Sequence, residues 1–322
     1  MEEQKKKKLS AGAIAGIVIG SLLVVIFFSS CSFGIGLFLG SSANSGGFST
    51  SDAIYQIDFE GQIIGTQTSS LLGVSGVTVE SFVSELENAE KNPHVKVILI
   101  RMDSPGGVAG ASQEMYSELK KVQKPVIVSV SNLCASGAYY VSCAADLIIA
   151  NKTSEIGSIG VIMQVPNLEE LYNKLGIKYT TIKQGKYKDI GSSDRELTEE
   201  EKKLLEDQTR QIYEIFIKDV SEGRKIDAEK VREIATGWVY LGDEALKLGL
   251  IDEIGTYTDA VKKAAEIGGI KGEPRIIKSA GQSIFDLFSS LSNVLLNLNK
   301  LGDKLGELNK LLDNNSQNNL FK

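Results

Sequence analysis

The chain has 322 residues, of which 42% are hydrophobic and 24% are charged, so a disordered chain is excluded. The formal net charge of −6 is too small to indicate a nucleic acid as the partner. Three cysteines in a chain of this length do not make a disulfide scaffold. There is one histidine, His94, so any catalysis by a Ser-His pair must use this residue.

The first 51 residues predict a membrane anchor. Lys5 to Lys8 make the start of the chain basic, and no further charged residue occurs within this segment. Residues 12–40 are mostly apolar and long enough to cross a bilayer as a helix. The preceding lysines place residues 1–11 in the cytoplasm, and residues 41–51 form a flexible linker. A cleaved secretory peptide is the alternative, but no small-residue cleavage site ends a short apolar core.

Residues 52–279 predict one α/β domain. Strands and helices alternate along it, and several strands are apolar throughout, which is typical of a mostly parallel sheet covered on both faces. The predicted strands are 53–59, 95–102, 125–131, 147–150 and 178–183. The predicted helices are 77–91, 111–122, 135–145, 168–175, about 198–221, 228–235, 243–248 and 259–267.

The longest predicted helix begins with a capping box formed by Thr198 and Glu201. Apolar side chains at helical spacing predict its inner face, which consists of Leu204, Leu205, Ile212, Phe216 and Val220. After the domain, residues 280–322 carry leucines at spacings of three and four, which predicts an amphipathic tail. This tail is expected to pack on protein, either on its own domain or on a second copy, because positive charge is too thin for a membrane-surface helix.

Two glycine-bearing turns follow predicted strands and are the candidate places for chemistry. In Asp103–Gly107 (DSPGG), the paired glycines allow a backbone N–H to face a cleft at the carboxyl end of a parallel sheet. In Leu133–Ala138, Ser136 has small neighbours and lies where a strand meets a helix. The N–H of Gly137 would then lie at a helix N-terminus and favour an oxyanion. Strand-to-helix turns use Gly and Ser for structural reasons too, so spacing alone leaves the role of Ser136 open.

A nucleophilic serine needs a base. His94 lies in a turn before a strand, at the end of the sheet opposite to the glycine turns, so a carboxylate or a lysine is required instead. A lysine acts as a base only if its pKa falls well below the usual value of about 10.4. The lysines after Ser136, among which the sequence does not discriminate, are Lys152, Lys174, Lys178, Lys183, Lys186 and Lys188. Cys134 and Cys143 are rival nucleophiles, but their apolar neighbours indicate buried structural thiols.

Several motifs, taken together and in order, resemble the signal peptide peptidase A family. After the N-terminal anchor they are D-S-P-G-G at 103–107, A-S-G-A-Y-Y-V-S-C-A-A-D at 135–146, I-G-S-I-G-V-I-M at 156–163 and G-K-Y-K-D-I at 185–190. The resemblance covers about residues 53–270. It implies a membrane-anchored serine protease with a Ser-Lys dyad and the ClpP/crotonase fold.

The same resemblance implies roles for individual residues. Ser136 would be the nucleophile and Lys188 the general base, with an oxyanion hole from the N–H groups of Gly107 and Gly137. Ser158 would help to hold the lysine. No cofactor and no metal are implied.

The family resemblance also implies partners and a location. Homo-oligomeric rings are expected, in which each dyad is completed across a subunit boundary. The substrates would be remnant signal peptides, cut in or near a bacterial cell membrane, with the catalytic domain outside the cytoplasm.

Two other classes of protein are alternatives. A crotonase-like acyl-thioester enzyme uses similar paired N–H groups but needs no serine nucleophile and usually no anchor. A membrane-tethered scaffold would keep the fold without the chemistry. The presence of both Ser136 and Lys188 favours the protease over the scaffold.

Overall fold

The computed structural model describes residues 51–65 and 76–278. The predicted anchor at 12–40 and the predicted tail at 280–322 lie outside these ranges. Within the described ranges, no helix is both long and apolar enough to cross a membrane. The limits of the predicted domain, 52 and 279, stay predictions.

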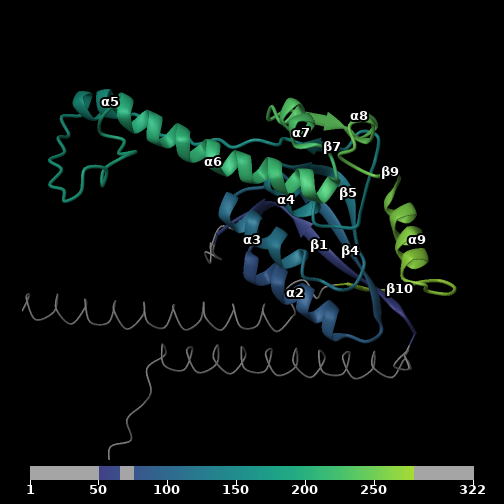
Figure 1. The fold of residues 1–322 in the computed structure, drawn as a ribbon. Helices are drawn as coiled ribbons and strands as arrows, with labels where there is room; N and C mark the ends of the chain where they lie inside the picture. The colour runs from purple at the N-terminus through teal and green to yellow at the C-terminus, as the bar shows by residue number, and fades with distance from the viewer. Residues whose placement is uncertain (1–50, 66–75, 279–322) are drawn as a thin grey trace, which may run out of the picture. The chain divides into compact units, whose positions relative to one another are not determined.

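A mostly parallel sheet organises the described part of the chain (Figure 1). It has eight strands there, with the main order β10-β1-β4-β5-β6-β9, and β7 pairs with β5 and with β8. Every pairing in this sheet is parallel except that of β7 with β8. The strands are β1 (Ala53–Glu60), β4 (Val95–Ser104), β5 (Val126–Ala135), β6 (Leu147–Ala150), β7 (Glu155–Gly157), β8 (Val239–Leu241), β9 (Glu253–Ile254) and β10 (Arg275–Lys278). The predicted α/β class with a mostly parallel sheet is confirmed.

Helices cover both faces of this sheet. The C-terminal half of α6 lies with α2, α3 and α4 on one face, and α9 lies on the other (Figure 1). A short separate ladder joins β2 (Gln62–Ile63) to β3 (Gly76–Val77). The helices are α2 (Val79–Lys91), α3 (Ala109–Leu119), α4 (Gly137–Ser142), α5 (Glu169–Lys174), α6 (Glu199–Arg224), α7 (Ala228–Ile234), α8 (Gly242–Lys247) and α9 (Tyr257–Ile267).

The apolar runs of the central strands serve two cores. In β4, Ile98 and Ile100 belong to the larger core under α2, α3 and α4, whereas Val97 and Leu99 belong to the smaller core under α9. Successive side chains of a strand point to opposite faces, so a strand buried on both sides has no polar alternation. This is why residues 97–100 at the centre of β4 are continuously apolar.

The C-terminal half of α6 is fixed to α4 and to the end of α7 by contacts of aromatic side chains. The rings of Tyr140 and Phe216 stack with their centroids 4.5 Å apart, and the Tyr140 hydroxyl donates a hydrogen bond to the Asp219 carboxylate. The Tyr213 hydroxyl donates to the Ala235 carbonyl at 2.7 Å, which joins α6 to the end of α7. These contacts hold α6 across the carboxyl end of β5.

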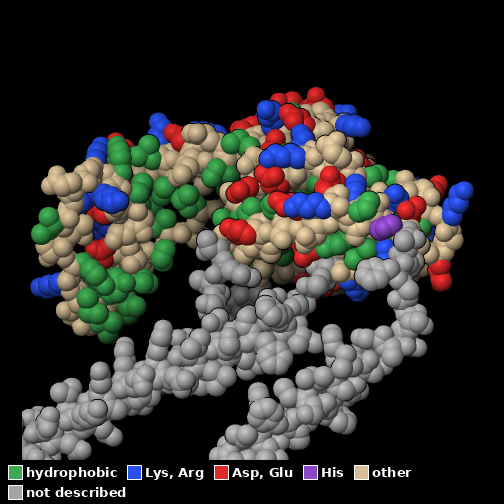
Figure 2. Space-filling view, turned by 90° about the horizontal axis from the view of Figure 1, so that it is seen from below, with side chains coloured by type: hydrophobic (Ala, Val, Ile, Leu, Met, Phe, Trp, Pro, Cys, Tyr) green, Lys and Arg blue, Asp and Glu red, His purple; other side chains and the backbone are tan. Residues whose placement is uncertain are grey.

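The N-terminal half of α6 lies away from the sheet, together with α5 and the segment between the two helices (Figure 1). We call residues 161–210 the arm. Figure 2 shows hydrophobic side chains gathered on its surface, at the left of the view. The exposed large apolar side chains of the arm are Ile162, Met163, Leu168, Leu171, Leu175, Ile177, Tyr179, Ile182, Tyr187 and Leu204.

The structure corrects one predicted element and part of another. The predicted strand at 178–183 is wrong, because this segment lies exposed on the arm and pairs with no strand among the described residues. Along α6, the predicted inner face is buried only at its C-terminal end, at Phe216 and Val220, whereas Leu204 is exposed. The predicted capping box of this helix is confirmed.

Candidate active site

A cavity of about 900 Å³ lies at the carboxyl ends of β4 and β5. Four of the predicted site residues line it together: Gly107, Ser136, Gly137 and Ser158. They come from turns that are separated in sequence but adjacent in the sheet. The parallel order β4-β5 explains this, because it brings the ends of both strands to the same edge.

Ser136 lies in a strained turn between β5 and α4. Its backbone has φ of +53° and ψ of −124°, a combination that residues with a side chain rarely adopt. The turn is held by two hydrogen bonds, from Ser136 N–H to Gly157 O (2.7 Å) and from Tyr140 N–H to Ser136 O (2.9 Å). Within the described ranges, the Ser136 Oγ has no hydrogen-bond partner. The conformation therefore presents a free hydroxyl to the cavity.

Two backbone N–H groups face the same place. Ile63 pairs with the strand-like turn around Gly107 through Ile63 N–H to Gly106 O (2.8 Å) and Val108 N–H to Ile63 O (3.1 Å). This pattern leaves the Gly107 N–H without an acceptor in the part of the chain that the structure describes. Gly137 is the first residue of α4, so its N–H has no intrahelical partner either.

The two N–H groups are close to each other because these glycines lack side chains. A Cβ atom on Gly137 would lie 3.2 Å from Gly107 N and would overlap the Ser112 side chain. A Cβ atom on Gly107 would overlap the Ile63 carbonyl. Paired backbone donors beside a serine hydroxyl have the geometry of an oxyanion hole.

Ser158 lies beside Ser136 in the neighbouring strand. β5 and β7 pair in register with Ala135 opposite Gly157, so the residues that follow, Ser136 and Ser158, leave the sheet side by side. Ser158 also has a positive φ, +48°, and its N–H donates to Trp238 O at 2.8 Å. The hydroxyl is thus placed within the cavity, and its role toward a lysine stays a prediction.

The rival nucleophiles and the histidine lie elsewhere. Cys134 and Cys143 are buried, and burial raises the pKa of the Cys134 thiol to about 12. A thiol with such a pKa is not a thiolate near neutral pH. His94 precedes β4 at its amino end, whereas the cavity lies at the carboxyl end. These positions agree with the sequence-based predictions that both thiols are buried and that His94 lies at the end of the sheet opposite to the glycine turns.

Lys188 does not share the cavity with Ser136. None of the six candidate lysines is among the described residues that line it. Lys188 is exposed on the segment between α5 and α6, at the far end of α6 from α4 (Figure 1). One chain thus brings together the serine, both N–H groups and Ser158, but not the lysine.

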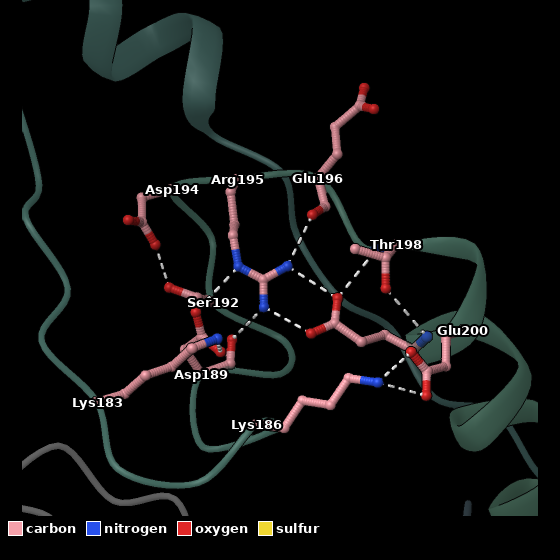
Figure 3. A network of polar contacts seen from close by, with 10 residues as sticks. Lys183, Lys186, Asp189, Ser192, Asp194, Arg195, Glu196, Thr198 and Glu200 are labelled. Atoms are coloured by element: carbon pink, nitrogen blue, oxygen red, sulfur yellow. Dashed lines mark hydrogen bonds and ion pairs between the residues drawn. The ribbon is translucent and has the colours of Figure 1, made fainter.

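The candidate lysines at 183, 186 and 188 differ in their partners, and Figure 3 shows the contacts of Lys183 and Lys186. The Lys183 ammonium contacts the Asp189 carboxylate, and the Lys186 ammonium lies 2.7 Å from Glu200 Oε1. The bond to Glu200 raises the pKa of Lys186, which makes it a poorer base at neutral pH. Lys188 has no carboxylate partner within the described residues. It is the lysine of this segment that is free to act elsewhere.

Comparison with known proteins gives the family. The model of peptidase family S49 matches residues 118–271. The chain is 39% identical over 199 residues to the "Putative protease slr0021" of Synechocystis sp., across 61% of this chain and 72% of the relative. This chain belongs to peptidase family S49.

Two other relatives are also similar in sequence. The "Putative protease MJ0651" of Methanocaldococcus jannaschii is 43% identical over 61% of this chain and 64% of the relative. The "Putative signal peptide peptidase SppA" of Enterococcus faecium is 34% identical over 65% of this chain and 61% of the relative. The chain thus spans less than two thirds of the length of these two relatives. The predicted resemblance to signal peptide peptidase A and the predicted class of serine protease are confirmed at the level of the S49 family.

The similarity of this chain to solved structures is lower than its sequence similarity to these relatives. A mutant of ClpP1 from Listeria monocytogenes aligns over 64% of this S49 chain and 93% of its own, with 13% identity and a TM-score of 0.43. The ClpP/crotonase name for the fold stays a prediction.

The sequence analysis did not identify the residues of α6 that form one wall of the cavity. Glu206, Thr209, Arg210 and Tyr213 line the cavity together with residues of the glycine turns. A signal was available, because these side chains recur at spacings of three and four along one face of the predicted helix. The sequence analysis considers only the apolar positions of this helix, since sequence alone does not show that the helix crosses the end of β5.

Proposed function

We propose that the chain is an endopeptidase whose Ser-Lys site is completed by two copies. Ser136 is the nucleophile in one copy, and Lys188 of the neighbouring copy is the general base. One observation carries this proposal: a free Ser136 hydroxyl beside two free N–H groups lines a cavity that none of the candidate lysines enters. Lys188, exposed on the arm, supplies the general base that the cavity lacks.

The chemistry follows from these groups. Neutral Lys188 accepts the proton of Ser136 Oγ while the oxygen attacks the carbonyl carbon of a peptide bond. The N–H groups of Gly107 and Gly137 donate to the oxyanion of the tetrahedral intermediate. Collapse of this intermediate breaks the C–N bond, and the Lys188 ammonium returns the proton to the leaving amine. Water, deprotonated by Lys188, then hydrolyses the Ser136 ester.

The apolar surface of the arm supports assembly with a second copy. Ile182 is 92% exposed and Ile162 is 84% exposed, and exposed apolar side chains of this density mark an interaction surface. Ile162 also lines the cavity, so a partner that covers it comes close to Ser136. A head-to-tail contact of this kind, repeated between copies, closes into a ring.

The proposed substrates are remnant signal peptides, and the proposed location is a bacterial cell membrane. Support comes from the predicted anchor at 12–40, with Lys5 to Lys8 on its cytoplasmic side and the catalytic domain outside the cytoplasm. The cavity wall is partly apolar, with Val108, Ile162 and Phe216, which suits peptides rich in hydrophobic residues. One relative carries the name signal peptide peptidase.

Complementation tests the shared site. Ser136→Ala and Lys188→Ala chains, each inactive alone, are produced together, and cleavage of a hydrophobic peptide is assayed. If the dyad forms between copies, random mixing at equal amounts regenerates about a quarter of the wild-type sites, because each needs one intact serine beside one intact lysine. Lys174→Ala is the matched control and should remain active, since that candidate lysine contacts Glu170 within its own helix, α5.

Two results would contradict the proposal. An unrestored mixture would place the dyad within one chain. Failure of a serine-directed fluorophosphonate to label Ser136 in the wild-type enzyme would exclude the nucleophile, and would favour the thioester enzyme or the scaffold.

A further inference from the structure

Arg195 is the centre of the polar network on the arm (Figure 3). Its Nη1 and Nη2 atoms donate to the two carboxylate oxygens of Glu201 at 2.8 and 2.7 Å. Its Nε donates to the Asp189 carboxylate at 3.1 Å, and Nη2 also donates to the Asp189 backbone carbonyl at 3.2 Å. One guanidinium therefore holds both the side chain and the backbone of the residue that follows Lys188.

The far end of this network is firmly attached to α6. Glu201 lies in the first turn of the helix, where its carboxylate accepts the Thr198 N–H at 2.9 Å. The Glu201 side chain is only 6% exposed and that of Asp189 13%. Contact with Arg195 lowers the pKa of both carboxyl groups to about 2, so both are ionised wherever the protein is folded near neutral pH.

The segment that carries Lys188 is a chain of tight turns. Lys188 N–H donates to Gly185 O at 3.3 Å, Ile190 N–H to Tyr187 O at 3.1 Å, and Ser192 N–H to Asp189 O at 3.1 Å. Such turns set the local shape of the segment, but they do not fix its place relative to α6. Two sets of contacts join the segment to the first turn of α6. Lys186 and Tyr187 bind the exposed carboxylate of Glu200. Arg195 binds Asp189 and Glu201, whose side chains are largely buried.

We propose that Arg195 is a positioning residue for the reaction: its fork of donors fixes the Lys188 segment to the first turn of α6, and so aims Lys188 at the cavity of the neighbouring copy. This inference rests on the proposed function, because it requires Lys188 to act as the base. Exposed ion pairs commonly contribute little. Here, however, both carboxylates are largely buried, and two of the five donated bonds go to backbone carbonyls, of Asp189 and Glu196.

The first test compares turnover in the assembled enzyme. Arg195→Ala should lower kcat roughly 100-fold, since a displacement of about 1 Å at a reacting group costs that much, while KM changes little. Arg195→Lys should also be strongly impaired, because an ammonium keeps the charge but cannot replace the planar fork. The matched control is Arg232→Ala, which removes an exposed arginine of α7 that contacts Glu214 of α6 and Glu229 of α7. It should leave kcat within about twofold.

The second test is complementation, which separates positioning from a general defect in folding. If Arg195 acts through the Lys188 of its own chain, Arg195→Ala mixed with Ser136→Ala recovers activity, whereas Arg195→Ala mixed with Lys188→Ala does not. A general folding defect would lower both mixtures alike. Asp189→Asn, which keeps the shape of the side chain and the Glu201 contact of Arg195, should behave in the same way with a smaller loss of kcat.

The outcomes distinguish this inference from the proposed function. Recovery in the mixture of Arg195→Ala with Lys188→Ala, equal loss in both mixtures, or near wild-type kcat in Arg195→Ala or Arg195→Lys, would overturn the positioning role alone. Activity in Lys188→Ala itself would overturn the assignment of the base, and the role of Arg195 with it.

Discussion

Ser136 has a backbone conformation that costs free energy, of order 1–3 kcal/mol for a residue with a side chain. The hydrogen bonds of its N–H and C=O to Gly157 and Tyr140 hold it there. Strain of this kind is consistent with a position selected for the direction of Oγ.

The Ser136→Gly variant should therefore be more stable than the Ser136→Ala variant. Both Ser136→Gly and Ser136→Ala remove the hydroxyl and should be inactive. The free energy of unfolding of the glycine variant should be about 1 kcal/mol higher than that of the alanine variant, because glycine adopts positive φ without a Cβ penalty. Chemical denaturation of the two variants measures the difference. Equal stabilities would show that the turn stores no strain.

The response to arginine at position 188 should show whether a proton is transferred there. Asp189 and Glu201 have pKa values of about 2, so both carboxyl groups stay ionised and do not change activity near neutral pH. Lys188→Arg should be inactive at every pH, since guanidinium is not deprotonated. An active arginine variant would mean that position 188 supplies charge, not proton transfer.

The glycine turn after β4 shows how an element presents backbone donors. Gly107 lies against the Ile63 carbonyl, so its N–H is held toward the cavity by a bridge between two strand-like segments.

Gly107→Ala should lower kcat by about 100-fold or more, because the added Cβ displaces this bridge and with it one oxyanion donor. Steady-state kinetics measure the effect, and fluorophosphonate labelling of Ser136 shows whether the nucleophile is intact. Gly110→Ala, where a Cβ meets nothing within 4 Å, is the control. Unchanged kcat in Gly107→Ala would remove its N–H from the mechanism.

Elements with a strong local pattern could be predicted from the sequence, whereas those that depend on distant partners could not. β4 and β5 were predictable because each contains a short continuous run of apolar residues, which indicates a strand buried on both faces. The segment 178–183 has β-branched residues, but no strand lies beside it within the described ranges, so its propensity is not realised. β7 and β8 are three residues each and too short to carry a periodicity.

The candidate site was predictable to a similar degree. The turns around Gly107 and Ser136 could be placed at one edge of the sheet, because parallel strands bring their carboxyl ends together. The wall supplied by α6, with Tyr213, and the network around Arg195 depend on where the helix crosses the sheet. The family resemblance supplied Lys188, which no spacing argument selected.

At the scale of the whole molecule, the exposed face of the arm should control assembly. Ile182→Asp should leave the thermal stability of the separated chain nearly unchanged, because this side chain is 92% exposed and contributes little to the fold. The same change should weaken association and activity together, since it places a charge in an apolar contact. Analytical ultracentrifugation and peptide cleavage measure both. Lys178→Asp, a charge change at an already polar position on the arm, is the control. Full assembly of Ile182→Asp would place the contact elsewhere.

The separation of the Ser136 cavity from Lys188 along one chain has a consequence for control of the activity. On the proposed shared site, a newly made chain carries a nucleophile and a base that do not meet, so it should be inactive until copies associate. The rate per chain should then rise with their surface density. Low density would keep the activity low, and other proteins would not be cleaved while copies are few.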